Sequence, residues 1–158
     1  MIAVKYDSPL GRLTLESDGT NLTAILFPGE ESRTGSPEIS KGNVLVLDSA
    51  RRQLDQYFAG RLQTFDLPLA PSGTDFQRKI WALLQKIPYG QTSTYAELAK
   101  MIGQPTACRA VGAANGRNPL PIVIPCHRVI SSSGKLTGYA GGLEAKQALL
   151  ELEGAMVK

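Results

Sequence analysis

The segment of this chain with the clearest capacity for chemistry is a Pro-Cys-His-Arg tetrad at residues 125–128. A thiolate is a strong nucleophile, but an ordinary cysteine, with a pKa of about 8.5, is only slightly ionised at neutral pH. The only histidine of the chain, His127, directly follows Cys126, and no Asp or Glu lies within 17 residues of the cysteine on either side. Both features favour the thiolate, so the tetrad indicates a nucleophilic cysteine with histidine as its base.

The tetrad also allows an interpretation without chemistry. The apolar run Ile122-Val123-Ile124 predicts a short buried strand, and a cysteine after it can be an inert, buried small side chain. We interpret Cys108, which lies among alanines, in that way. Neighbouring residues of a strand point to opposite faces, so contact between Cys126 and His127 needs a turn or a bridging water. The residues alone leave both interpretations of Cys126 open.

A histidine that acts as a base works better when a carboxylate orients it. The acids that follow the tetrad are Glu144, Glu151 and Glu153. They lie in or beside an expected helix at residues 144–152, where most glutamates are simply solvated. Sequence position does not choose between them.

The composition limits the classes of protein to which the chain can belong. Its 158 residues, 42% of them hydrophobic and 20% charged, are typical of one globular domain or two small ones. No apolar run approaches the roughly 20 residues of a membrane helix, and the N-terminus has no signal-peptide pattern. Two cysteines are too few for a disulfide scaffold, and with one histidine they cannot complete a zinc site by themselves. We therefore expect a cytoplasmic protein with no membrane contact.

The net charge of +3 is unevenly distributed along the chain. Residues 1–73 have seven basic and nine acidic side chains, a net charge of −2, whereas residues 74–158 have ten and five, a net charge of +5. Residues 98–143 contain no acid, and their basic side chains are Lys100, Arg109, Arg117, Arg128 and Lys135. Such an asymmetry suggests a polyanionic partner.

Hydrophobic periodicity predicts two domains of different character. Three β-patterned runs, at residues 1–6, 12–17 and 22–27, precede a loop at 28–42 and a helix at 44–58. Pro71-Ser72-Gly73 is the expected boundary, and the sequence after it is mainly helical. We expect an α/β (α+β) fold with a scaffold domain at residues 1–73, made of a three-stranded sheet and a helix. The second domain, at residues 74–158, would contain the cysteine.

Two capping-box patterns mark helix starts at Thr74 and Thr94. The helix after Thr94 ends near Gly103, and a third helix of small residues follows at about 106–115, with Arg109 as its only charged side chain. Two short helices around a glycine-containing break have the outline of a helix-turn-helix. Small residues permit close approach to another surface, which is either nucleic acid or the domain's own core.

Together these motifs make the chain resemble the methylated-DNA–protein-cysteine methyltransferases, or O6-alkylguanine-DNA alkyltransferases. The matching motifs lie in the family's order between residues 75 and 153. They are Asp75-Phe76-Gln77, Ile87-Pro88-Tyr89-Gly90, Ser93-Thr94-Tyr95, Arg109-Ala110-Val111-Gly112, Arg117-Asn118-Pro119, Ile124-Pro125-Cys126-His127-Arg128-Val129 and Gly138-Tyr139-Ala140-Gly141-Gly142-Leu143. The N-terminal half matches only in outline. Since residues 1–73 contain neither Cys nor His, the zinc site of some family members is not expected.

The resemblance implies a role for individual residues. Cys126 would accept the alkyl group, and its proton would pass through a water to His127, which Glu153 would orient. Asn118 would brace the site, and Tyr95 would donate a hydrogen bond to the departing guanine. The residues implied at the base pocket are Val129, Gly138, Tyr139 and Ala140, the last standing where other members have serine. Those implied at the DNA surface are Thr94, Tyr95, Arg109, Ala110, Ala114 and Arg117.

The implied function is repair of O6-alkylguanine, and also of O4-alkylthymine, in double-stranded DNA. A monomer without a cofactor would flip the damaged nucleotide, fill the gap with Arg109 and transfer the alkyl group to Cys126 once and irreversibly. Two other interpretations remain. A lesion-binding protein without transfer activity would not need the intact Cys126, and a Cys-His hydrolase with an unrelated substrate would leave the helix-turn-helix outline unexplained.

Overall fold

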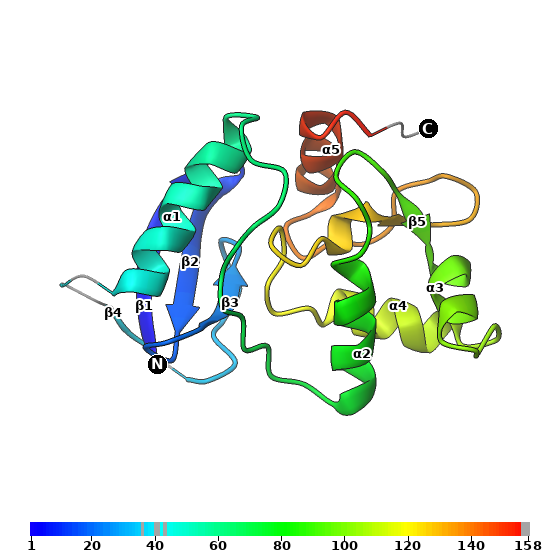
Figure 1. The fold of residues 1–158 in the computed structure, drawn as a ribbon, viewed down its shortest axis with the longest axis horizontal. Coiled ribbons are helices and arrows are strands. Elements are labelled where there is room, and N and C mark those ends of the chain that lie inside the picture. The colour runs from blue at the N-terminus through cyan, green and yellow to red at the C-terminus, as the bar shows by residue number, and fades with distance from the viewer. Residues whose placement is uncertain (36, 40–41, 43, 156–158) are drawn as a thin grey trace. The chain divides into compact units, whose positions relative to one another are not determined.

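The computed structural model describes residues 1–35, 37–39, 42 and 44–155 (Figure 1). The chain divides into two compact units, Met1–Ser72 and Gly73–Lys158. The first unit is a sheet with a helix and the second is mainly helical, so the fold is mixed α+β, as the sequence predicts. No helix within the described ranges is long and apolar enough to cross a membrane.

The N-terminal unit is built on a sheet of four strands in the order β3-β2-β1-β4. Its three predicted strands are confirmed: β1 (Ile2–Ser8), β2 (Gly11–Ser17) and β3 (Leu22–Leu26) pair in antiparallel fashion. The fourth strand, β4 (Glu38–Ile39), pairs in parallel with β1, so the loop prediction is wrong at these two residues. A two-residue strand is too short to show a periodicity of its own. Residues 36, 40 and 41 of the predicted loop lie outside the described part of the chain.

One face of this sheet packs on α1 (Leu45–Phe58) (Figure 1). The cross-strand pairs Val4–Leu15 and Tyr6–Leu13 are buried, and apolar residues of α1 recur on its buried side at helical spacing. The Tyr6 hydroxyl donates to Asp55 on α1 at 2.6 Å. Burial, together with this carboxylate, raises the pKa of Tyr6 above its ordinary value. The sheet and the helix are therefore joined by both apolar and polar contacts.

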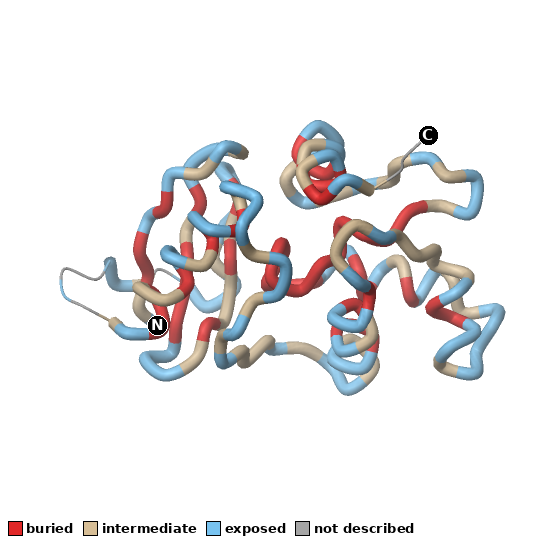
Figure 2. Tube along the Cα trace, turned by 45° about the horizontal axis from the view of Figure 1, so that its top comes forward, coloured by how far each residue is buried: buried red, intermediate tan, exposed pale blue. Residues whose placement is uncertain are grey.

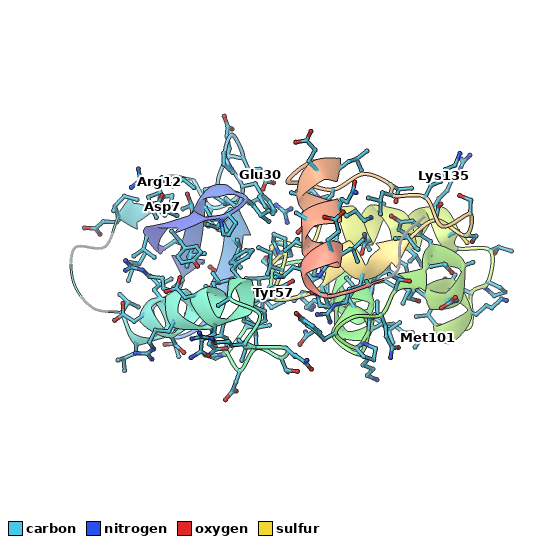
Figure 3. All side chains as sticks on the ribbon, turned by 90° about the horizontal axis from the view of Figure 1, so that it is seen from above. Asp7, Arg12, Glu30, Tyr57, Met101 and Lys135 are labelled. Carbon is cyan, nitrogen blue, oxygen red and sulfur yellow. The ribbon has the colours of Figure 1, made fainter. Side chains whose placement is uncertain are left out.

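The opposite face of the sheet carries the alternate residues of the same strands. Lys5 pairs with Thr14 and Ala3 pairs with Glu16 on that face, and Asp7 pairs with Arg12 near the β1–β2 turn. Asp7 and Arg12 form an exposed ion pair of 3.5 Å (Figure 3). This face therefore contains charged side chains, in contrast to the apolar face under α1.

The C-terminal unit begins with α2 (Asp75–Leu84), whose predicted capping box is present in full. Thr74 Oγ1 accepts from the Gln77 backbone N–H, and the Gln77 side chain accepts from the Thr74 N–H. At the second predicted box, Thr94 Oγ1 accepts from the Glu97 N–H. The reciprocal contact is not formed there, because the Glu97 carboxylate accepts from the Ser93 hydroxyl instead. Thr94 thus caps the next helix with only half of a capping box.

Three helices of this unit pack together. The helix α3 (Tyr95–Met101) follows β5 (Ser93–Thr94), and after a turn comes α4 (Cys108–Gly116), two residues later than predicted. The buried Trp81 of α2 donates from Nε1 to the Ala114 backbone carbonyl of α4 at 2.8 Å. The α3–turn–α4 pair has the helix-turn-helix arrangement that the sequence predicts, and α2 holds it from its buried side.

Every residue from 118 to 130 is buried (Figure 2). The strand predicted at residues 122–124 is wrong: these residues form turns, and Ile122 has a φ of +74°. Three prolines at 119, 121 and 125 fix φ and lack an N–H, so the segment cannot join a strand ladder. A 3-10 turn, η1 (Cys126–Arg128), follows, then β6 (Val129–Ile130), which pairs with β5, and finally α5 (Leu143–Leu152).

Candidate active site

The buried turns before Cys126 are held by the side chain of Asn118. Its Nδ2 donates to the Ile124 carbonyl at 2.8 Å, and its Oδ1 accepts from the Leu120 N–H at 3.0 Å. One amide therefore satisfies a backbone donor and a backbone acceptor that no strand partner reaches. Ile122, between the two, has a left-handed backbone that a β-branched residue rarely adopts. Asn118 thus fixes the otherwise unfavourable turn that leads to Cys126.

Cys126 is the first residue of η1 and is 5% exposed, and the next residue, His127, is completely buried. Successive side chains of a 3-10 turn are about 120° apart around its axis, not on opposite faces as in a strand. The geometric objection to a Cys126–His127 pair therefore rested on a strand that does not form. Cys126 and Cys108 both remain thiols.

His127 and Arg128 both bind the carboxylate of Glu153, which follows α5. His127 Nε2 lies 2.7 Å from Glu153 Oε2, and neither side chain is exposed. Arg128 donates from Nε to Oε1 at 2.7 Å and from Nη2 to Oε2 at 3.0 Å. Of the acids that the sequence offers, Glu153 is thus the one that contacts the histidine, whereas Glu144 and Glu151 are exposed.

The Ile87-Pro88-Tyr89-Gly90 turn holds the other side of this network. The Ile87 carbonyl accepts from Arg128 Nη1 at 2.6 Å, and the guanidinium lies 5.8 Å from the centre of the Tyr89 ring. Gly90 has a φ of +81°, and a Cβ on it would lie 3.1 Å from the Glu153 carbonyl. Glycine is therefore needed there both for the turn and for its close approach to Glu153.

The contacts of Glu153 determine which nitrogen of His127 carries a proton. Burial lowers the pKa of His127 below its ordinary value, and Arg128 and Lys146 act in the same direction, while Glu153 acts against them. The Glu153 carboxylate accepts two hydrogen bonds from Arg128 and a third from His127. Because an ionised carboxylate only accepts hydrogen bonds, His127 Nε2 is the donor, and the hydrogen of the neutral imidazole is on this nitrogen. Nδ1 is then the basic nitrogen, and it makes no hydrogen bond with the part of the chain that the structure describes. It is available to accept a proton.

Lys146 of α5 is a fully buried cation beside the same site. Its Nζ donates to the Val129 carbonyl at 2.7 Å and to the Thr137 carbonyl at 3.2 Å. Burial lowers the pKa of Lys146, and its Coulombic interaction with Cys126 opposes that shift. Because an interaction between two charges acts equally on both, the ammonium group favours the thiolate of Cys126.

The residues predicted at the base pocket lie on β6 and on the segment after it. Val129 is buried, with its carbonyl bound to Lys146. Gly138 and Ala140 are exposed and Tyr139 is half-buried in the irregular segment before α5. The Tyr95 hydroxyl lies 2.6 Å from the Thr137 hydroxyl and so connects the start of α3 to this segment.

The outer side of α4 carries most of the predicted DNA-surface residues. Arg109, Ala110, Ala113, Gly116 and Arg117 are exposed along it, and small side chains separate the two arginines. Ala114 does not belong to this surface, which corrects the prediction. It is 2% exposed, and its carbonyl is bound to Trp81. At 3.6 residues per turn, position 114 lies about 140° around α4 from Arg109.

Sequence reasoning missed the roles of Arg128, Lys146 and Thr137, and it missed Ala113 on the outer side of α4. Lys146 could have been noticed, because the apolar positions Ala145, Leu149 and Leu150 place it on the buried side of α5. A lysine on such a side needs a specific partner. Thr137 carries no such signal, since its contacts come from segments far away in the chain.

Two family models together match nearly the whole chain. The model described as "6-O-methylguanine DNA methyltransferase, ribonuclease-like domain" matches residues 1–71. The model described as "6-O-methylguanine DNA methyltransferase, DNA binding domain" matches residues 75–155, which contain the tetrad, α4 and Glu153. The N-terminal unit is therefore part of the family resemblance as well.

Individual relatives agree with the family models. A methylated-DNA–protein-cysteine methyltransferase of Methanosarcina acetivorans is 49% identical over 150 residues, which are 95% of this chain and 96% of the relative. One of Mycobacterium tuberculosis is 52% identical over 151 residues, 93% of this chain and 88% of the relative. The crystal structure of Mycobacterium tuberculosis OGT in complex with DNA superposes with a TM-score of 0.90 at 49% identity, covering 98% of this chain and 93% of that one. The chain therefore belongs to the 6-O-methylguanine DNA methyltransferase family.

Proposed function

We propose that this protein repairs O6-alkylguanine in double-stranded DNA, as a monomer, by moving the alkyl group to its own Cys126. The observation that carries the proposal is the buried network of His127, Arg128 and Glu153, formed on the same 3-10 turn as Cys126. The network supplies an oriented neutral base next to a cysteine. A protein that only binds DNA would not need such a base.

The chemical step is a direct displacement at the alkyl carbon. The proton of the Cys126 thiol passes through a water to His127 Nδ1, and the adjacent Lys146 ammonium stabilises the thiolate that forms. The thiolate sulfur then bonds to the alkyl carbon, the bond between that carbon and O6 breaks, and its electron pair stays on the guanine. A proton returned to the guanine completes the exchange of S–H for S–alkyl.

Glu153 and Arg128 prepare this step without touching the substrate. The carboxylate keeps the His127 hydrogen on Nε2 and stabilises the imidazolium when Nδ1 takes up the proton. Arg128 holds both oxygens of the carboxylate through two hydrogen bonds. Both are positioning residues, whereas Cys126 and His127 are the catalytic residues of the proposal.

The outer side of α4 provides the proposed route to the damaged base. The alkyl carbon cannot be reached inside a stacked duplex, so the nucleotide has to rotate out of the stack at a cost of a few kcal/mol. Small residues on α4 would allow close approach to a groove, and Arg109, which is exposed on this helix, would enter the duplex and offset part of that cost. Tyr95 would donate to the guanine as negative charge develops on it, and Val129, Gly138, Tyr139 and Ala140 would line the base pocket.

The alkylated protein would be unable to react a second time. A thioether does not hydrolyse under ordinary conditions, and within the described residues no cluster of three or more His, Cys, Asp or Glu side chains could hold a metal to assist its removal. Transfer is therefore expected once per protein molecule, without a cofactor.

Analysis of the DNA after reaction tests the proposal. A duplex that carries one O6-methylguanine is mixed with increasing amounts of protein, and its nucleosides are separated by chromatography. The proposal expects unmodified guanine to appear in an amount equal to the protein added. Cys126→Ala should bind the same duplex and yield no guanine. Binding by the parent protein without guanine formation would favour a lesion-binding protein, and more guanine than protein would exclude a single turnover.

A further inference from the structure

The N-terminal unit contains a buried carboxylate with no partner among the residues that the structure describes. Glu16 of β2 is 1% exposed. Its Oε2 makes no hydrogen bond, and the side chain forms no ion pair with any residue in the described ranges. An ionised carboxylate that is taken out of water without a partner is unfavourable, so buried acids are normally paired. Within the described residues Glu16 is an exception, so its carboxylate can pair with a group from outside the chain.

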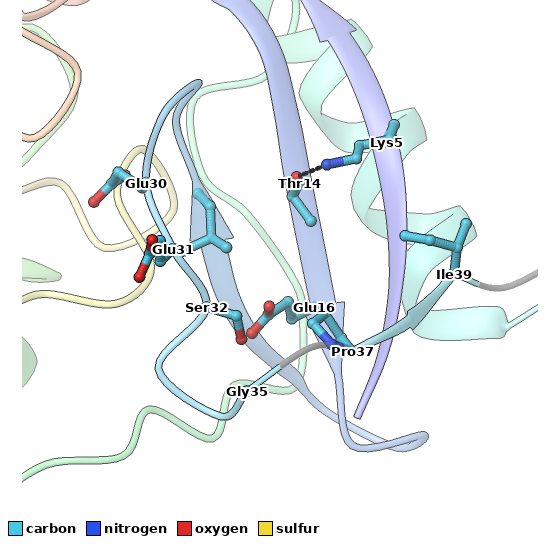
Figure 4. A pocket seen from close by; sticks show the side chains of 10 residues that line it. Lys5, Thr14, Glu16, Glu30, Glu31, Ser32, Gly35, Pro37 and Ile39 are labelled. Carbon is cyan, nitrogen blue, oxygen red and sulfur yellow. Dashed lines mark hydrogen bonds between the residues drawn. The ribbon is translucent and has the colours of Figure 1, made fainter.

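The sheet supplies no donor to Glu16. Its direct cross-strand neighbours are Ala3 on β1 and Ala24 on β3, whose methyl side chains offer no hydrogen-bond donor. Lys5 lies one pair further along the same face, but its ammonium donates to Thr14 at 2.7 Å (Figure 4). The pairing of the strands therefore leaves a space over Glu16 that is flanked by two alanines.

This space is part of a pocket of about 540 Å³ on the face of the sheet opposite α1. Figure 4 shows Glu16 between the strands and residues 30–35, with the Glu16 side chain turned toward Ser32 and Pro37. Leu26, Pro37 and Ile39 provide apolar lining. The pocket thus combines apolar walls with one buried acid.

Two further acids, Glu30 and Glu31, line the same pocket. Glu30 Oε1 accepts from the Phe27 backbone N–H at 2.8 Å, which fixes the turn that follows β3. Its second oxygen and the exposed Glu31 add negative charge to the lining. With Lys5 engaged by Thr14, acidic groups dominate the polar lining.

We propose that this pocket binds an alkylammonium group. The ammonium would pair with the Glu16 carboxylate, and the methylene chain would lie along Leu26, Pro37 and Ile39. A metal ion suits the site less well, because within the described residues no three His, Cys, Asp or Glu side chains are close enough together to ligate one. The site lies in the N-terminal unit and does not depend on the alkyl-transfer reaction.

The alkylammonium group can belong to a free polyamine or to the lysine side chain of another protein. Calorimetric titration of the full chain with spermidine probes the first source. Titration with a short peptide that has one central lysine, compared with the same peptide with norleucine, probes the second. Tighter binding of spermidine than of the lysine peptide assigns the site to polyamines, and the reverse order assigns it to a protein side chain. Absence of binding by both probes overturns the proposal.

Glu16→Gln keeps the shape of the side chain and removes its charge. We expect it to weaken binding of the better probe by at least about tenfold. Asp7→Asn is the matched control, since it removes one negative charge from the same hairpin outside the pocket. It should change the affinity by less than about twofold. Equal affinities of the parent protein and Glu16→Gln overturn the proposal.

Ala24→Lys gives a second test that keeps Glu16 in place. Position 24 lies directly opposite Glu16 on the same face, so a lysine there brings an ammonium group of the chain itself to the pocket. The thermal unfolding midpoint should rise, and binding of the external amine should be lost. An unchanged amine affinity in a folded Ala24→Lys protein contradicts the proposed site.

Discussion

His127 and Glu153 are joined by a hydrogen bond of 2.7 Å in which neither side chain is exposed to solvent. The two residues are separated by 26 positions, and Arg128, the neighbour of His127, binds the same carboxylate through two nitrogens. The carboxylate therefore has a fixed position and keeps its charge next to the imidazole. This relationship makes His127 a base with a defined proton-accepting nitrogen.

Glu153→Gln should impair both the reaction and the stability of the protein. The amide cannot stabilise the imidazolium, so transfer should slow by about 100-fold or more. It also leaves the buried Arg128 without its counter-charge, which should lower the free energy of unfolding by about 3–5 kcal/mol. Single-turnover kinetics and urea unfolding measure the two effects.

Glu151→Gln is the matched control for that substitution. Glu151 is exposed on α5, two positions earlier, and its carboxylate accepts a hydrogen bond from the Gln147 side chain. It should leave both the transfer rate and the free energy of unfolding nearly unchanged. Equal effects of the two substitutions would show that the network around His127 has no special role.

The single histidine permits a direct measurement of its protonation by NMR. Burial lowers the pKa of His127 below the ordinary value of about 6.5. The unfolded chain then binds more protons than the folded protein at pH values between the lowered pKa and about 6.5. Stability should therefore fall as the pH drops below about 6.5, and rise again toward neutral pH. A histidine resonance that titrates at or above pH 6.5 would contradict the neutral base.

Lys146→Met should change the pH dependence of the reaction. The substitution removes the buried ammonium that favours the Cys126 thiolate, so transfer at neutral pH should slow by roughly tenfold and require a higher pH. Lys135→Met, on an exposed position of the segment before α5, is the control. A purely structural role of Lys146 would lower stability without moving the pH profile, and that outcome would remove its electrostatic role.

Asn118→Ala should loosen the turns that lead to Cys126. The substitution leaves the Ile124 carbonyl and the Leu120 N–H without partners in a buried segment, so the free energy of unfolding should fall by about 2–4 kcal/mol. Asn118→Asp keeps an acceptor for Leu120 but puts a buried carboxylate oxygen against the Ile124 carbonyl, so it should destabilise the protein at least as much as alanine does. A fully stable and active Asn118→Ala protein would rule out the bracing role.

Arg109→Ala separates access to duplex DNA from the chemical step. Arg109 is exposed on α4 and takes no part in the network around His127. We expect repair of a duplex to slow by roughly tenfold or more, with little change in the reaction with free O6-alkylguanine base. Lys79→Ala, an exposed cation on α2, should affect neither substrate. Equal losses on duplex and free base would exclude insertion of Arg109 into the DNA.

The parts of the fold that sequence predicts well are those set by local rules. The capping residues Thr74 and Thr94 mark the starts of α2 and α3, and alternating residues mark β1 to β3. The strand predicted at residues 122–124 fails because periodicity cannot distinguish a buried strand from buried turns. The three prolines around it were visible, and their missing N–H groups argue against a ladder.

The candidate site is predictable only in part for a related reason. The Cys126–His127–Arg128 motif is contiguous and is visible in the sequence, whereas the choice of Glu153 came from the family resemblance. Lys146 and Thr137 reach the site through contacts between distant segments, which no local pattern encodes. Ala114 was assigned to the DNA surface through the resemblance, although its spacing from Arg109 and its contact with Trp81 put it on the buried side of α4.

The mass of the intact protein after reaction tests the central claim most directly. The protein is incubated with an excess of duplex that contains O6-methylguanine, weighed by mass spectrometry and then digested to locate the change. We predict a mass increase of a single methylene group on every molecule, located on the peptide that contains Cys126 and absent from Cys126→Ala. An unchanged mass with restored guanine in the DNA, or a methyl group on Cys108, would contradict the assignment of Cys126 as the acceptor.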